Sequence, residues 1–230
     1  MSTAESRGPF KEQAAAKAVE FIRPGMVVGL GTGSTAEYML ALLGQKVREG
    51  LEIRGVPTSL KTAALARRHG IPLIDAEDDW AIDVALDGAD QADPHLNLIK
   101  GGGGALLKEK IVAAAAKQFI VMVDHSKCVP VLGASCPLPI EVVPFGWRST
   151  AKQIESLAGA KTVIRRQEDQ VFRTEAGHYI LDLHAGGIED PARLERDLNR
   201  IAGVVETGLF VGRATLLIIG RPEGVRLIEA

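Results

Sequence analysis

Residues 26–35 read MVVGLGTGST: a short apolar run, a glycine-rich turn and then two hydroxyl-bearing side chains. An apolar run bounded by turn glycines is typical of a buried strand. Residues 35–43, TAEYMLALL, have the composition of a helix. A strand, a tight turn and a helix in direct succession make up the first half of a βαβ unit. This stretch therefore predicts an α/β fold.

The same alternation extends along the first 130 residues. Strands that alternate with helices predict right-handed crossovers and a mostly parallel sheet with helices on both faces. Further helices are expected at residues 12–21, 61–69 and 106–116, and further strands at residues 51–56, 71–74, 81–86 and 119–123.

The pattern changes near Gly133, where several short strands and two helices predict a small α+β unit. The very apolar strand at 215–219 suits the first sheet again. We therefore expect a small domain at 133–205, inserted into a larger α/β domain formed by 1–132 and 206–230. Within the small domain, strands are expected at residues 138–143, 161–165, 170–173 and 178–183, and helices at residues 150–157 and 191–201.

Composition excludes several classes of protein. The 230 residues carry 27 basic and 29 acidic side chains, so no overall positive field attracts nucleic acid. Apolar runs such as 214–220 are far shorter than the roughly 20 residues of a membrane-spanning helix. The polar residues 1–11 do not resemble an export signal, and two cysteines eight residues apart match no zinc pattern. We expect a cytoplasmic protein with free thiols and no nucleic-acid or membrane partner.

The first candidate site is the glycine-rich turn with Thr32, Gly33, Ser34 and Thr35. Backbone N–H groups at a helix N-terminus and neighbouring hydroxyls suit a phosphate group. The following residues do not complete a dinucleotide-binding fingerprint, and the lysine of a Walker A loop is missing. The alternative is a tight turn in which a hydroxyl only caps the helix.

The second candidate site is the sequence Asp87, Gly88, Ala89, Asp90, directly after the strand at 81–86. Ligands of open parallel sheets bind beyond the carboxyl ends of the strands, so two carboxylates here could bracket one small ligand. The alternative is that each carboxylate caps a turn.

The third candidate site begins at Lys100, which precedes four consecutive glycines, and it includes Glu109 in the next expected helix. A run of glycines is entropically costly to order and indicates backbone that lies close to something else. A carboxylate and a lysine suit proton transfer, with Glu109 as base and Lys100 as stabiliser of a developing oxyanion. The alternative is that Glu109 only complements the helix dipole.

The fourth candidate is Lys127, just beyond the strand at 119–123, where a phosphate would favour a cation. It could equally be a surface lysine. The neighbouring pair Asp124 and His125 lacks the nucleophile motif of a serine hydrolase. The five histidines show no metal-ligand spacing, so we expect no metal site.

Together with PLPIEV at 137–142 and the glycine-containing stretch 203–210, these motifs resemble the type A ribose-5-phosphate isomerase family. The resemblance runs from about Lys11 to the C-terminus. It implies a Rossmann-like α/β domain with an inserted ferredoxin-like domain, assembled as a homodimer. It also implies an aldose–ketose isomerase of the non-oxidative pentose phosphate pathway, without metal or cofactor, that interconverts D-ribose 5-phosphate and D-ribulose 5-phosphate.

The resemblance also implies residue roles. Glu109 is then the general base that moves a proton between C2 and C1 through a cis-enediolate. Asp87, Asp90 and Lys100 bind sugar hydroxyls, assist ring opening and stabilise the enediolate. The remaining substrate contacts implied are Thr32, Gly33, Ser34, Thr35, Gly88, Ala89, Gly101, Gly102, Gly103, Lys127 and Lys11. Gly104 departs from the family, where alanine is common.

Three alternatives remain at this stage. A non-catalytic sugar-phosphate sensor domain would need the phosphate loop but neither Glu109 nor Lys100. An NAD-dependent oxidoreductase is disfavoured by the incomplete fingerprint. An amino-sugar phosphate deaminase would need a ring-opening histidine, for which His95 is the only candidate.

Overall fold

The computed structural model describes residues 7–75 and 77–230; residues 1–6 of the polar N-terminal stretch and residue 76 lie outside that description. The chain forms two compact units. The first contains the described residues through Ala89, together with Lys108–Cys128 and Arg213–Ala230, and the second contains Asp90–Leu107 and Val129–Gly212. The second unit thus includes residues 90–107, which the sequence did not separate from the first. A compact unit need not fold alone. The expected limits, a small domain at 133–205 and a larger one formed by 1–132 and 206–230, therefore stay a prediction.

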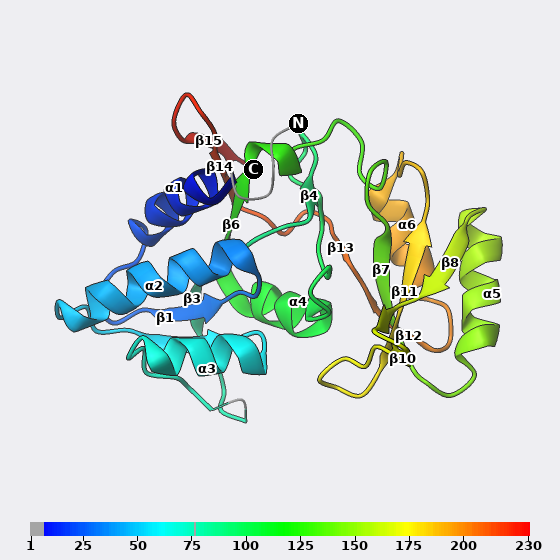
Figure 1. Ribbon diagram of the computed structural model, residues 1–230, viewed down its shortest axis with the longest axis horizontal. Helices are drawn as coiled ribbons and strands as arrows, with labels where there is room; N and C mark the ends of the chain where they lie inside the picture. The colour runs from blue at the N-terminus through cyan, green and yellow to red at the C-terminus, as the bar shows by residue number, and fades with distance from the viewer. Residues whose placement is uncertain (1–6, 76) are drawn as a thin grey trace. The chain divides into compact units, whose positions relative to one another are not determined.

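The first unit is built on a six-stranded sheet with the order β15-β14-β6-β3-β1-β2 (Figure 1). Every neighbouring pair is parallel except β14 with β15. The predicted α/β class with a mostly parallel sheet is confirmed. The strands are β1 (Val27–Leu30), β2 (Arg54–Pro57), β3 (Ile82–Asp87), β6 (Ala116–Asp124), β14 (Leu216–Gly220) and β15 (Arg226–Glu229).

Helices lie on both faces of this sheet. Alternate strand residues such as Val28 and Leu30 share one core with α1 and α2, as the two-residue period of a strand requires. On the opposite face Gly29 has no side chain, and a Cβ there would lie 2.5 Å from Val112 Cγ1 of α4. The glycine therefore lets α4 approach the sheet. The helices of this unit are α1 (Gly8–Val19), α2 (Ser34–Arg48), α3 (Leu60–Arg68), α4 (Leu106–Ala115, begun in the second unit) and the short 3-10 helix η2 (His125–Lys127).

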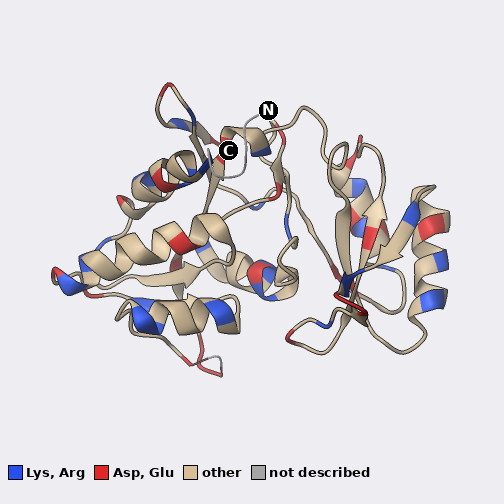
Figure 2. Ribbon diagram, in the orientation of Figure 1, with Lys and Arg blue, Asp and Glu red and all other residues tan. Residues whose placement is uncertain are grey.

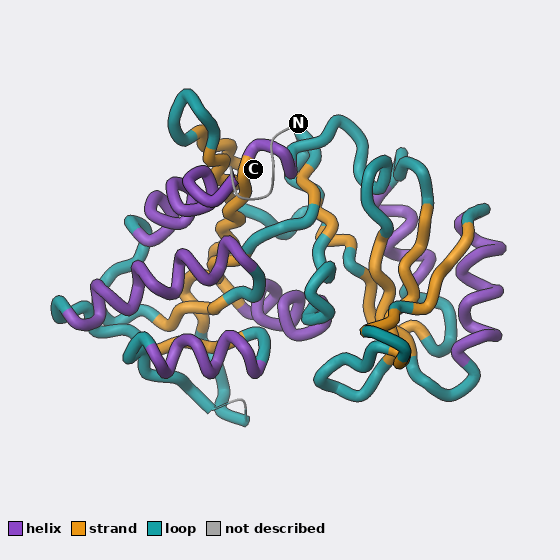
Figure 3. Tube along the Cα trace, in the orientation of Figure 1, coloured by secondary structure: helices purple, strands orange, loops and turns teal. Residues whose placement is uncertain are grey.

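The second unit contains an antiparallel four-stranded sheet of order β12-β7-β11-β8. Helices α5 and α6 pack against one apolar face of it, which includes Ile140 and Leu181. Short strands separated by loops complete the unit (Figure 3). Its elements are β4 (Gln91–Ala92), β5 (Leu98–Ile99), β7 (Leu138–Val142), α5 (Trp147–Ala158), β8 (Lys161–Ile164), β9 (Arg166–Gln167), β10 (Gln170–Val171), β11 (Tyr179–His184), α6 (Pro191–Leu198), β12 (Val204–Thr207) and β13 (Leu209–Phe210).

Several elements differ from the sequence predictions. The strand expected at 71–74 is reduced to a single bridge between Leu73 and Gly55. Helix α1 begins at Gly8 rather than at 12, because a proline in the first turn needs no hydrogen-bond acceptor there. The pairs β4–β5 and β5–β13 were missed, since two-residue strands show no period.

Most helices carry charges of both signs, whereas α3 carries only Lys and Arg (Figure 2). None of the helices that the structure describes is long and apolar enough to cross a membrane.

Candidate active site

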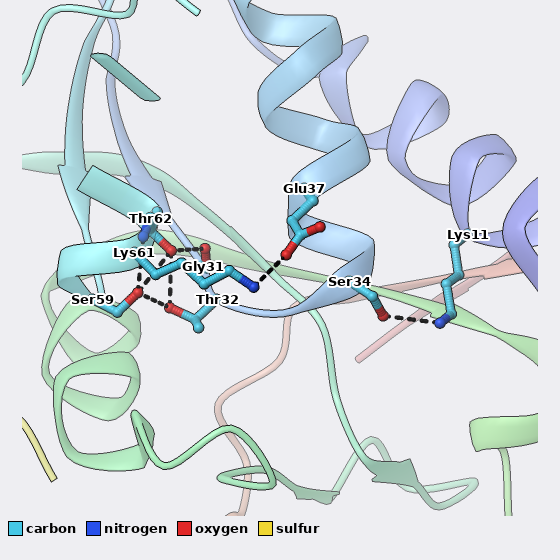
Figure 4. A network of polar contacts seen from close by, with 8 residues as sticks. All are labelled: Lys11, Gly31, Thr32, Ser34, Glu37, Ser59, Lys61 and Thr62. Atoms are coloured by element: carbon cyan, nitrogen blue, oxygen red, sulfur yellow. Dashed lines mark hydrogen bonds and ion pairs between the residues drawn. The ribbon is translucent and has the colours of Figure 1, made fainter. Parts of the chain in front are cut away.

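The glycine-rich turn joins β1 to α2 in the first unit. Gly33 directly precedes the helix with φ of 120°, a conformation that favours glycine. The first N–H groups of a helix, here those of Ser34 and Thr35, have no acceptor within the helix. Lys11 of α1 donates a hydrogen bond from Nζ to Ser34 Oγ at 2.9 Å (Figure 4). A cation, a hydroxyl and a helix N-terminus meet here, which is the chemistry that binds a phosphate.

Asp87, at the end of β3, holds the turn from one side. Its side chain is buried at 3% exposure. Its Oδ1 accepts hydrogen bonds from the N–H groups of Thr32 at 3.1 Å and Gly88 at 2.7 Å. A Cβ on Gly31 would lie 2.1 Å from the same oxygen, so a larger residue has no room there. The carboxylate thus fixes the backbone of the turn.

A cluster of buried hydroxyls holds the turn from another side (Figure 4). Thr32 Oγ1 lies 2.7 Å from Thr58 Oγ1 and donates to Ser59 Oγ at 2.9 Å. Thr62 Oγ1 donates to the Gly31 carbonyl at 3.0 Å. Sequence reasoning missed Thr58, Ser59 and Thr62, although three hydroxyls follow β2 as a visible cluster in residues 58–62. The hydroxyl of Thr32 therefore faces this cluster and positions the turn.

Lys127 ends the helix η2, directly after β6. Asp124, 1% exposed, caps this helix by accepting a hydrogen bond from Ser126 N at 3.0 Å. His125 packs its ring edge-on against Phe10, with centroids 5.3 Å apart. The Asp124–His125 couple considered from sequence is therefore a cap and an aromatic contact. Burial and the charge of Asp124 raise the pKa of the Cys128 thiol, which disfavours the reactive thiolate.

Glu109 lies in the first turn of α4 and is 5% exposed. A buried carboxylate near a helix N-terminus is shielded from bulk water, and the helix dipole favours its charge. Such an environment suits a base that must accept a proton from carbon without competition from solvent.

In the second unit the glycine run wraps around Asp90. Gly102 N–H donates to Asp90 Oδ2 at 2.7 Å, and a Cβ on Gly102 would lie 2.8 Å from Asp90 Oδ1. Gly101 has φ of +100°, a backbone conformation that favours glycine. Gly102 therefore has no room for a side chain beside the Asp90 carboxylate, and Gly101 needs to be glycine because of its positive φ.

Lys100 is buried at 2% exposure in the same unit. Its N–H donates to Gly208 O at 2.8 Å, and its ammonium lies 5.5 Å from the centroid of the Phe210 ring. At the other end of the run, Gly104 has φ of +80°, and a Cβ there would lie 2.4 Å from Phe172 Cζ. Glycine at position 104, where the family commonly has alanine, therefore leaves room for the ring of Phe172.

Comparison with known proteins identifies the family. The family model of ribose 5-phosphate isomerase A (phosphoriboisomerase A) matches residues 54–224. A relative named ribose-5-phosphate isomerase A from Thermomicrobium roseum is 48% identical over 220 residues, which cover 95% of this chain and 93% of the relative. The chain belongs to the ribose 5-phosphate isomerase A family. The resemblance seen in the sequence motifs is confirmed.

Solved structures of the family share the fold. Ribose 5-phosphate isomerase A from Methanocaldococcus jannaschii is 38% identical, with a TM-score of 0.93 and coverage of 98% of this chain and 100% of that one. A D-ribose-5-phosphate isomerase in complex with phospho-erythronic acid is 43% identical, with a TM-score of 0.92 and coverage of 96% and 98%.

The structure places the predicted site residues of this family member in two groups. Within the first unit, Lys11 contacts Ser34, Asp87 binds the turn at Thr32, and a Cβ on Gly88 would lie 3.8 Å from Thr35 Cβ. Within the second unit, Asp90 contacts the glycine run. The first group is Lys11, Thr32, Gly33, Ser34, Thr35, Asp87, Gly88, Ala89, Glu109 and Lys127, and the second is Asp90, Lys100, Gly101, Gly102 and Gly103.

Proposed function

We propose that this chain interconverts D-ribose 5-phosphate and D-ribulose 5-phosphate, with Glu109 as the base that carries the proton. The observation that carries the proposal is the buried carboxylate of Glu109 on α4, in a chain of the ribose 5-phosphate isomerase A family. The complex of a related isomerase with phospho-erythronic acid, a phosphorylated sugar acid, supports a sugar phosphate as ligand.

The proposed reaction starts from the open-chain aldose. Glu109 removes the proton from C2, and the electron pair of that bond forms the C1–C2 double bond of a cis-enediolate. The electron pair of the C1 carbonyl moves onto the C1 oxygen, and a proton then passes from the C2 hydroxyl to that oxygen. The protonated Glu109 returns its proton to C1 as the C2 oxygen becomes the carbonyl, which yields the ketose. The ammonium of Lys100 offsets the negative charge that develops on the enediolate oxygen. Asp87 and Asp90 accept hydrogen bonds from sugar hydroxyls and assist ring opening.

The phosphate is proposed to bind at the N-terminus of α2. The N–H groups and hydroxyls of Ser34 and Thr35 are its donors there, and Lys11 and Lys127 supply positive charge. Lys11 already contacts Ser34, which supports its place in this group. In this proposal Thr32 shapes the turn that presents these donors, and the backbone of Gly33, Gly88 and Ala89 and of Gly101–Gly103 leaves room for the substrate.

Proton NMR in D₂O tests the function. EDTA-treated protein is expected to convert D-ribose 5-phosphate to D-ribulose 5-phosphate, with solvent deuterium entering at C1, because a proton on a carboxyl group exchanges with water. Binding without conversion contradicts the proposal and favours a sensor domain. Deuterium at C1 supports the enediolate route, because a direct hydride shift from C2 would carry no solvent deuterium.

We also propose that the enzyme acts in the cytoplasm as a homodimer. Cys128 and Cys136 are thiols rather than a disulfide, which suits a reducing compartment. Phe145 is 92% exposed, and large exposed apolar side chains are often covered by a subunit contact. Light scattering should give about twice the mass of one 24.5 kDa chain. The mass of a single chain contradicts the dimer.

A further inference from the structure

One arginine of the second unit connects the antiparallel sheet to the glycine run. Arg165 follows β8, and its Nε donates to Asp182 Oδ2 of β11 at 2.9 Å while Nη2 bonds Asp182 Oδ1. The two side chains are 15% and 16% exposed. A bidentate pair of this kind holds the guanidinium plane in one orientation.

The remaining nitrogen of this guanidinium points at the glycine run. Arg165 Nη1 donates to the carbonyl oxygens of Gly101 at 2.7 Å and Gly102 at 3.2 Å. Two consecutive carbonyls are therefore held by one side chain, which is itself held by the sheet.

The Gly101–Gly102 peptide group is restrained at both of its polar atoms. Its carbonyl accepts hydrogen bonds from Arg165 Nη1 and, at 3.0 Å, from the N–H of Gly104, and Asp90 Oδ2 accepts from its N–H at 2.7 Å. A peptide between two glycines otherwise rotates readily, because neither residue has a Cβ that restricts φ and ψ. Rotation of this peptide would turn its carbonyl oxygen toward the Asp90 carboxylate, and the hydrogen bond to Asp90 would be lost.

We propose that Arg165, oriented by Asp182, is a positioning residue that fixes the Gly101–Gly102 peptide and, through it, the Asp90 carboxylate. Its effect on catalysis rests on the proposed function, but its effect on the loop does not. Lysine cannot replace it, because a single ammonium lacks the planar fork that reaches a carboxylate and two carbonyls together.

Amide hydrogen exchange tests the effect on the loop without any substrate. Arg165→Ala is expected to speed exchange in the segment 100–105 by about tenfold, since the restrained peptide becomes mobile. The matched control is Arg173→Ala in the same unit, because Arg173 instead contacts Tyr179 and the Gly177 carbonyl. Unchanged exchange at 100–105 in Arg165→Ala overturns the proposal. If Arg165→Ala does not fold, Arg165→Lys and Asp182→Asn decide by the same measurement.

Steady-state kinetics with D-ribose 5-phosphate test the effect on the reaction. In Arg165→Ala we expect kcat to fall about tenfold with KM nearly unchanged, because the phosphate donors lie on α2 while the sugar groups depend on the loop. Arg165→Lys is expected to recover little of this loss. Kinetics equal to those of Arg173→Ala overturn the catalytic part of the proposal. A wild-type chain inactive on this substrate refutes the proposed function instead, and hydrogen exchange then still decides the role of Arg165.

Discussion

Glu109→Gln is expected to lower kcat for the isomerisation of ribose 5-phosphate by about 10²–10⁴-fold, the usual contribution of a general base. Glutamine has the shape of glutamate but cannot take a proton from C2. We expect KM to stay within a few-fold, because the proposed phosphate donors on α2 are untouched. Circular dichroism and the melting temperature should show that the variant folds.

The deuterium experiment follows both proposed proton transfers in this variant. In D₂O, Glu109→Gln should stop the entry of deuterium at C1 together with turnover, since in the proposed mechanism one group performs both proton transfers. The matched control is Glu49→Gln, which removes the charge of an exposed carboxylate at the C-terminus of α2. This variant should leave kcat unaltered. Normal turnover by Glu109→Gln would show that another group is the base.

Gly31→Ala should impair both stability and activity. The added Cβ would lie 2.1 Å from Asp87 Oδ1 and 2.6 Å from Asp87 Cβ, so either the turn or the carboxylate must move. Overpacking of this kind lowers the free energy of unfolding by about 1–3 kcal/mol. Displacement of this turn, the proposed phosphate site, by an ångström can lower kcat/KM by about 10²-fold.

Gly88→Ala is the matched control for stability. The nearest atom to a Cβ at Gly88 is the Met122 carbonyl oxygen at 3.7 Å, an ordinary contact, so its free energy of unfolding should stay close to that of the wild type. Urea denaturation of both variants measures the difference. If Gly31→Ala is as stable as Gly88→Ala and retains wild-type kcat/KM, Asp87 does not restrain the turn as described.

Much of the fold could be predicted from sequence because local pattern and structure agree there. The stretch 26–35 has the apolar run, turn and helix start that appear as β1 and α2. The apolar residues of 215–219 predicted a return to the first sheet, and β14 does pair with β6. The terminal strand β15 was not predicted, because its residues are mostly exposed and show no apolar face.

The candidate residues were also found by local signals, since glycines, carboxylates and lysines stand out in short motifs. The residues that hydrogen-bond to the candidate loops could not be found in this way. Thr62 and Gly31 lie 31 positions apart, and Arg165 and Gly101 lie 64 apart. No periodicity or motif connects such residues, so only the folded chain shows that they hydrogen-bond.

The α/β class and the family were predicted from local features of the sequence, which also singled out the candidate catalytic and phosphate-binding residues. The fold class depends on hydrophobic period, and the resemblance to the family depends on residue types in short motifs. Only the folded structure shows that Asp87 leaves no room for a side chain at Gly31. It also shows which hydroxyls contact Thr32 and which arginine restrains the glycine run. Those answers depend on contacts between segments far apart in the chain, which arise only when strands and turns pack together.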